Sequence, residues 1–324
     1  MTSEPSRPGR PFEPATYTPE RPLRIVVGWD KSGSDGIELA AWFGKSLPIS
    51  VSVISAAPRT WKKPISRKKH EKWLKAETEK FTRLADGVLK EHLPRSQWAA
   101  EHCTLIDAQD EAAALTEAAK RLSADIIFLG SAAKLKKARF LASSVAEAIM
   151  HSSPLPLGLA PKGLKLSKKG ITRINYVFLR PDRGQDTSGL RAAARLAARL
   201  GVPLRLVSLS PELPGEAVFD AAIGSPEEVA DWHEASLSLL DLARDEVFAA
   251  TASEASAPLE VETCLANGSG WKKATACLKW KKGDLICLGS HPAAPHRRVL
   301  VGSRASEFLR FAPAPVVIYP RVDA

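Results

Sequence analysis

One pattern occurs twice in this chain: a short apolar run, a glycine-serine turn, a loop and the start of a helix. The first copy is Asp125–Leu129 followed by Gly130-Ser131, and the second is Asp284–Leu288 followed by Gly289-Ser290. Unbroken apolar runs of this length are typical of strands that helices cover on both faces, as in a parallel sheet. The pattern therefore predicts an α/β fold in which each copy ends a central strand.

Strand-like and helix-like segments alternate on both sides of a Lys- and Gly-rich stretch, residues 162–171. Expected strands cover residues 23–29, 49–54, 98–106, 125–129 and 155–159, then 174–179, 204–209, 258–265, 284–288 and 316–318. Expected helices cover residues 37–45, 62–93, 112–122 and 144–151, then 187–200, 225–250, 271–280 and 304–311. This order predicts two tandem α/β domains, each with a parallel sheet and helices on both faces. The predicted boundaries are a disordered Pro-rich tail at 1–22, domain 1 at 23–161, a linker at 162–171 and domain 2 at 172–321.

The composition narrows the class of protein without naming a partner. A net charge of +10 favours acidic partners such as nucleotides or nucleic acid. Apolar runs stay short of the roughly 20 residues that cross a bilayer, and residues 1–22 lack an apolar signal core, so we expect a cytoplasmic protein without a membrane partner. The basic segments 62–90 and 271–282 are expected to be solvated helix faces, which makes nucleic acid an unlikely ligand.

The chain has no recognisable catalytic or metal-binding spacing. The four cysteines form no CxxC pair and are expected to be buried thiols. His291 and His296 flank the second glycine loop, but no spacing supplies a third ligand, so we expect no metal. Without a Ser/His/Asp arrangement or paired carboxylates, we expect a protein that is not an enzyme.

The two glycine-serine turns are candidate phosphate sites. A small-residue turn at the start of a helix exposes backbone N–H groups, and the helix dipole favours negative charge there. In such sheets, ligands lie beyond the carboxyl ends of the strands where the strand order reverses. Asp30, at the exit of the first strand, would face the same crevice as Gly130.

These residues resemble the motif of the universal stress protein family in its tandem two-domain form. The family's nucleotide-binding members carry Gly-x2-Gly-x9-Gly-Ser between the fourth strand and the last helix. The second half of this chain keeps that spacing from Gly289 to Gly302-Ser303, with Pro292 in place of the middle glycine. The first half keeps Gly130 and ends the motif in Ser143-Ser144. Residues 144–149 followed by 154–157 are similar to the family's last helix and strand.

The resemblance covers both halves and implies several features. Each half would have a five-stranded parallel sheet of order 3-2-1-4-5, and the last strands of the two halves would meet antiparallel in an internal pseudo-dimer. Whether two such chains pair again into a homodimer stays open. An acid at the first strand's exit would meet the adenine, and Asp30 matches that position. In the second half the matching residue is Leu179 or Arg180, with Asp182 as a displaced substitute.

The resemblance thus predicts a set of nucleotide-binding residues. They are Asp30, Gly130, Ser131, Ser143, Ser144, Val145, Gly289, Ser290, Gly302, Ser303 and Arg304. Each has a plain structural alternative, as a turn residue or part of a solvated loop. Three functions therefore stay open: a stress-linked sensor that binds ATP with Mg²⁺, an interaction scaffold without any cofactor, and a weak ATPase.

Overall fold

The computed structural model describes residues 21–31, 33–57, 66–132, 140–181, 187–211, 226–252, 258–291 and 298–322. The first half contains β1 (Leu23–Gly28), α1 (Asp35–Phe43), β2 (Ile49–Ala56), α2 (Arg67–His92), β3 (Trp98–Ile106), α3 (Glu111–Arg121), β4 (Ile126–Gly130), α4 (Ser144–Met150) and β5 (Leu157–Ala160). The second half contains β6 (Arg173–Phe178), α5 (Ser188–Leu200), β7 (Leu204–Ser210), α6 (Pro226–Thr251), β8 (Val261–Asn267), α7 (Trp271–Ala276), β9 (Asp284–Leu288), α8 (Ser303–Leu309) and β10 (Val316–Ile318).

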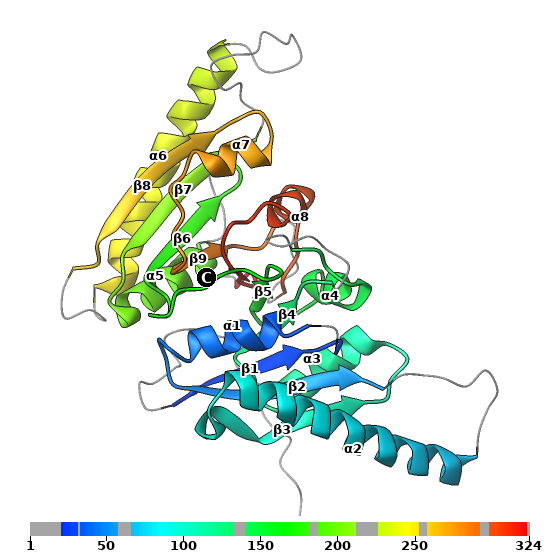
Figure 1. Cartoon of the computed structure of the whole chain (residues 1–324). Coiled ribbons are helices and arrows are strands. Elements are labelled where there is room, and N and C mark those ends of the chain that lie inside the picture. The colour runs from blue at the N-terminus through cyan, green and yellow to red at the C-terminus, as the bar shows by residue number, and fades with distance from the viewer. Residues whose placement is uncertain are drawn as a thin grey trace, which may run out of the picture.

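The strands form one ten-stranded sheet built from two five-stranded parallel halves (Figure 1). The order is β3-β2-β1-β4-β5-β10-β9-β6-β7-β8, so each half has the predicted order 3-2-1-4-5. The halves join where β5 and β10 pair antiparallel, with Val317 opposite Gly158. The predicted α/β class and the predicted antiparallel junction are both confirmed. Because that junction reverses the strand direction, the carboxyl ends of the two sets of strands lie at opposite edges of the sheet.

Helices cover both faces of the sheet, as the buried strand sequences require. One buried cluster contains residues of α1, α2, α5 and α6, and the other contains residues of α3, α4, α7 and α8. Along β1, Ile25 and Val27 face the first cluster and Val26 faces the second, which is the period-two alternation of a strand. Both clusters include residues from both halves of the chain, so the core is continuous across the junction.

The two boundary segments are attached to the folded core where the structure describes them. Within the expected tail, the Arg21 guanidinium pairs with the buried Asp125 carboxylate. In the expected linker, the Gly163 amide donates to Asp35 at 2.8 Å and the Ser167 amide donates to the Lys282 carbonyl at 2.9 Å. The linker therefore contacts both halves. The rest of the expected tail, residues 1–20, lies outside the described residues.

One helix is shorter than the sequence suggests. A helix is expected over 271–280, but α7 ends at Ala276. The Thr275 carbonyl accepts from the Leu278 amide at 3.3 Å and from the Trp280 indole at 2.8 Å, and these two bonds replace the one that another α-helical turn would make.

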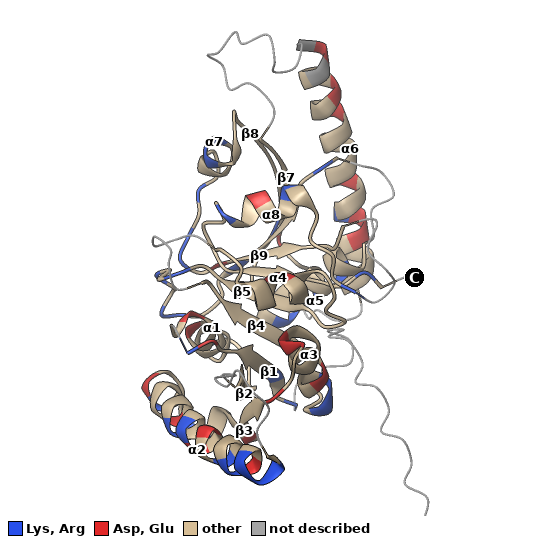
Figure 2. Cartoon of the chain, turned by 90° about the vertical axis from the view of Figure 1, so that its right-hand side faces the viewer, with Lys and Arg blue, Asp and Glu red and all other residues tan. Residues whose placement is uncertain are grey.

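The long helix α2 carries charges of both signs. Figure 2 shows Lys and Arg interleaved with Asp and Glu along it. One pair, Arg67 and Glu71, is joined at 2.8 Å across one helical turn. In the described part of the chain, none of the helices combines the length and apolar character that crossing a membrane requires.

Candidate functional site

The predicted residues of the first half gather around one pocket. The pocket has a volume of about 270 Å³ and lies where the chain leaves β1 and β4, the neighbours at which the strand order reverses. Five predicted residues line it: Asp30, Gly130, Ser131, Ser143 and Val145. Ser144, also predicted, is not among the lining residues.

A close approach of two glycines shapes this pocket. Gly36, in the first turn of α1, packs against Gly130 at the end of β4. A Cβ atom at Gly36 would lie 3.3 Å from the Gly130 nitrogen, and one at Gly130 would lie 3.4 Å from the Gly36 nitrogen. The start of α1 can therefore reach the exit of β4 only with small residues at both positions. The second half repeats this contact between Gly189 of α5 and Gly289.

The two predicted serine hydroxyls hold the protein's own backbone. Ser131 is buried, and its Oγ accepts from the Leu141 amide at 3.0 Å, which closes the loop after β4. Ser143 is the N-cap of α4, and its Oγ accepts from the Ala146 amide at 3.2 Å. Both serines thus shape the loop that surrounds the pocket.

Three charged residues in the same pocket escaped the sequence reasoning: Lys31, Asp35 and Glu111. Lys31 has a left-handed backbone (φ 66°), and its Nζ donates to the Ala56 carbonyl at 3.3 Å. Burial lowers the pKa of Lys31. The only local sign of these residues was the turn sequence after Asp30, which predicts a turn but not the direction in which its side chains point.

Asp35 introduces a second carboxylate beside the glycine contact. Burial raises the pKa of Asp35, and the hydrogen bond from the Gly163 amide opposes this effect. With Asp30 and Glu111, it makes three carboxylates against one ammonium group among the described lining residues. The first pocket is therefore acidic.

The second half forms a smaller pocket at the matching place. Ile25 of β1 pairs with Ile126 of β4, and Ile174 of β6 pairs with Leu285 of β9 in the same register. Counted from these matching pairs, Leu179 stands at the position that Asp30 has in the first half. The pocket has a volume of about 90 Å³. Its lining includes the predicted residues Gly289, Ser290, Gly302, Ser303 and Arg304. Asp182, the suggested substitute acid, lies outside the described residues, as do Pro292 and His296.

Two side chains lie against the glycine and the strand exit of the second pocket. The His291 ring packs on Gly302, where a Cβ atom would lie 2.5 Å from His291 Cδ2. Arg304 occupies the position that Val145 has in the first half, and its Nη1 donates to the Leu179 carbonyl at 3.5 Å. Arg180 also lines this pocket. The described lining is therefore basic, in contrast to the first pocket.

The model of the universal stress protein family matches residues 23–160 and again residues 182–320. The chain belongs to the universal stress protein family. A universal stress protein of Mycobacterium tuberculosis strain H37Rv is 26% identical over 314 residues, which is 92% of this chain and all of the relative. A universal stress protein of Mycobacterium bovis matches to the same extent.

Solved structures share the fold at low sequence identity. The crystal structure of a universal stress protein from Archaeoglobus fulgidus has a TM-score of 0.57 and 15% identity, covering 93% of this chain and 97% of that one. A protein of Pseudomonas aeruginosa PAO1, described as functionally unknown, has a TM-score of 0.50 and 12% identity, with 94% of each chain covered. These likenesses extend over both universal stress protein halves of the chain.

Proposed function

We propose that this protein is a regulatory universal stress protein that binds one adenine nucleotide, with Mg²⁺, in its first half and does not turn it over. The observation that supports this most directly is the first pocket. It lies at the point where the strand order reverses, and five of the six residues predicted in that half line it. Its volume of about 270 Å³ is near the lower end of ligand pockets, about 300 Å³.

Asp30 would select the base. It is the acid that the family resemblance places against adenine, and it lines the pocket beside the exit of β1. A carboxylate accepts hydrogen bonds, and the exocyclic amino group of adenine donates them. The second half has Leu179 at this position, and a leucine side chain offers no acceptor.

The charge of the pocket bears on how the phosphates would be held. Asp35 lies beside the glycine contact, since a Cβ atom at Gly130 would lie 3.8 Å from Asp35 Cβ. A bare triphosphate there would meet a carboxylate of like charge. Mg²⁺ bridges carboxylates and phosphates, so we expect nucleotide binding to need the metal. Lys31 is the one positively charged side chain among the described residues that line this pocket.

The second half supports a different role. Its pocket of about 90 Å³ is too small for a nucleotide, and His291 and Arg304 take up the space beside Gly302 and Leu179. This observation favours the second candidate function, a scaffold that uses the folded surface without a ligand, for this half of the chain.

The test is to measure ATP binding with and without Mg²⁺ by titration calorimetry and by thermal shift. Asp30→Ala removes the base acceptor, and Leu179→Ala is the control at the same position of the second half. A hydrogen bond to a charged group contributes about 1.5–3 kcal/mol, so Asp30→Ala should weaken binding about 10- to 100-fold. Leu179→Ala should leave the affinity unchanged. Any ligand that prefers the folded state also raises its melting temperature.

Two other results would decide against this function. No binding and no thermal shift at millimolar ATP with Mg²⁺ would favour the scaffold for the whole chain. Steady release of phosphate that persists through repurification and disappears in Asp30→Ala would show an ATPase instead.

A further inference from the structure

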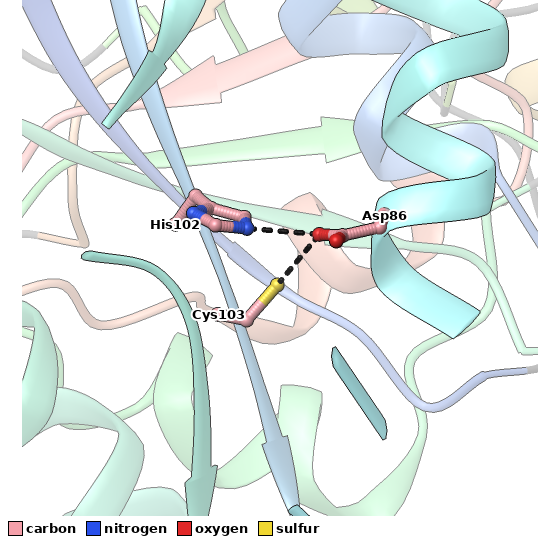
Figure 3. Close-up of side chains that lie close together, drawn as sticks. All are labelled: Asp86, His102 and Cys103. Carbon is pink, nitrogen blue, oxygen red and sulfur yellow. Dashed lines mark hydrogen bonds and ion pairs between the residues drawn. The ribbon is translucent and has the colours of Figure 1, made fainter. Parts of the chain in front are cut away.

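A cluster of three side chains capable of binding a metal lies outside both pockets. Asp86 extends from α2, and His102 and Cys103 extend from β3 (Figure 3). His102 Nε2 lies 2.8 Å from Asp86 Oδ1, and Cys103 Sγ lies 4.0 Å from the same oxygen. All three ligand atoms lie within 4.8 Å of one another. Figure 3 shows both strand side chains pointing toward the helix.

An irregularity in β3 makes this arrangement possible. Neighbouring residues of a regular strand point to opposite faces of the sheet, so His102 and Cys103 would normally diverge. Between β2 and β3 the register breaks: Val51 pairs with Trp98, but Val53 pairs with Cys103. A bulge of this kind turns two consecutive side chains to one side, and bulges recur beside functional sites.

The donors are held in place by other contacts. The His102 ring packs against the Trp98 ring, with the centroids 5.2 Å apart and the planes tilted by 41°. The Arg95 guanidinium lies over the Trp98 ring, 4.2 Å from the ring centroid. Asp86 follows Ala85, which is fully buried in the contact between α2 and the sheet. The cluster therefore needs little reorganisation to take up a ligand.

We propose that Asp86, His102 and Cys103 form a binding site for Zn²⁺. Sulfur, imidazole nitrogen and carboxylate oxygen are the ligands of zinc, whereas Mg²⁺ and Ca²⁺ prefer oxygen alone. Tetrahedral bonds of about 2.0–2.3 Å put neighbouring ligand atoms roughly 3.3–3.6 Å apart. The separations of 2.8 and 4.0 Å lie on either side of that spacing and the third is at most 4.8 Å, so side-chain shifts on the order of 1 Å complete the geometry.

Metal binding replaces two hydrogen bonds and releases one proton. The thiol proton of Cys103 leaves to solvent as the sulfur–zinc bond forms. Without metal, His102 donates its Nε2 proton to Asp86. On metal binding the ring exchanges with solvent to the tautomer protonated on Nδ1, which gives the Nε2 lone pair to the metal with no net change in the ring's proton count. The fourth position stays open to water or to an external ligand, which is the arrangement of zinc sites that do chemistry. The Asp86 side chain is 44% exposed and so gives the metal a path from solvent.

The site would join the edge strand of the sheet to the helix that covers it. β3 is the outermost strand of the first half, and α2 packs on it. Occupancy would therefore stabilise α2 against β3 in addition to any role of the open position. Sequence spacing gave no sign of this, because Asp86 belongs to a different element from the other two residues.

Cobalt substitution tests the proposal on the intact, metal-stripped protein. Co²⁺ bound to a thiolate gives a near-ultraviolet charge-transfer band, and we expect this band to saturate at one equivalent and to disappear when Zn²⁺ is added. Cys103→Ser should abolish the band. Loss of a residue behind the ligands typically costs 10- to 100-fold in metal affinity, so His102→Gln should weaken Zn²⁺ binding by more than about 100-fold.

The other cysteines provide matched controls. Cys264 lies on the corresponding strand β8 with Glu262 3.4 Å away, and Cys277 is exposed. Cys264→Ser and Cys277→Ser should keep the band at full intensity. If Cys103→Ser does not fold by circular dichroism, Asp86→Asn, which preserves side-chain shape, decides the question through its Zn²⁺ affinity. No band at stoichiometric Co²⁺, or a band that survives in Cys103→Ser, would overturn the proposal.

Discussion

Single residues at matching positions distinguish the two pockets. The strand register places Asp30 and Leu179 at the same position of the two pockets. The short helices α4 and α8 also occupy matching positions, and their second residue is Val145 in α4 and Arg304 in α8. Together with His291, these differences contribute to a larger, acidic pocket in the first half and a smaller, basic one in the second. A duplicated fold can therefore keep its architecture while its two sites lose equivalence.

At the same scale, Asp35→Asn should change how stability depends on pH. Burial raises the pKa of Asp35 above its ordinary value of 3.8 in the folded state. The stability that accompanies the protonated form is present in full below 3.8 and is lost as the pH rises through the raised folded pKa. Asparagine does not ionise and can still accept from the Gly163 amide. The variant should therefore gain stability over the wild type as the pH rises from below 3.8 to neutral.

Urea denaturation at a series of pH values measures this difference directly. The variant's midpoint minus the wild-type midpoint should increase with pH across the range in which Asp35 ionises. A difference that is constant, or that shrinks toward neutral pH, would show that burial of the charge at Asp35 is not unfavourable.

Among the elements, the two described ends of the loop that follows the central strand are joined alike in both halves. The Ala132 amide donates to the Leu141 carbonyl at 2.9 Å, and the His291 amide donates to the Leu300 carbonyl at 2.9 Å. In each loop a serine hydroxyl accepts from the returning chain, Ser131 at 3.0 Å and Ser290 at 3.4 Å. The serine of the glycine-serine turn thus maintains the loop even where the family's glycines are replaced. This explains how the fold can persist while the phosphate motif changes.

Two glycines on different elements should respond in opposite ways to alanine. Gly87 is exposed on α2 and has nothing within 4 Å of an added Cβ, so Gly87→Ala should stabilise by about 0.5–1 kcal/mol. Gly158 is buried on β5, where an added Cβ would overlap the Phe128 ring. Gly158→Ala should therefore destabilise by at least about 1–3 kcal/mol, the usual cost of overpacking.

Equilibrium unfolding of the two variants beside the wild type provides the measurement. A neutral result for Gly158→Ala would mean that β5 and Phe128 can move apart without cost, and that the junction between the halves is loosely packed.

On the scale of the whole molecule, the junction between β5 and β10 makes the two halves one structure. The pair is antiparallel and fully buried, with Leu157 and Leu159 on β5 opposite Ile318 and Val316 on β10. The same clusters of apolar side chains continue on both faces of the sheet past the junction. Neither half therefore has a free β5 or β10 edge in the intact chain.

Residues 1–161 expressed alone should form a homodimer. Removal of the second half exposes the β5 edge, whose residues Leu157, Leu159 and Ala160 are at most 4% accessible in the intact protein. An uncovered apolar edge strand pairs readily with another strand, and a second copy offers the same antiparallel partner surface. Light scattering at a series of concentrations should report twice the monomer mass. A stable, soluble monomer of this half would contradict the expectation, and a charged substitution at Leu159 should dissociate the dimer.

The order of the elements, the duplication and the strands with the clearest apolar patterns follow from the amino-acid sequence alone. β3 and β9 begin and end where predicted, because local apolar patterning and the flanking turn residues report burial directly. Lys31 and Asp35 in the first pocket, His291 over Gly302, and the approach of Asp86 to His102 were decided only by the tertiary structure. These contacts depend on strand register, on a bulge and on how helices seat against the sheet. Such interactions join positions far apart in the chain, so local periodicity holds no record of them.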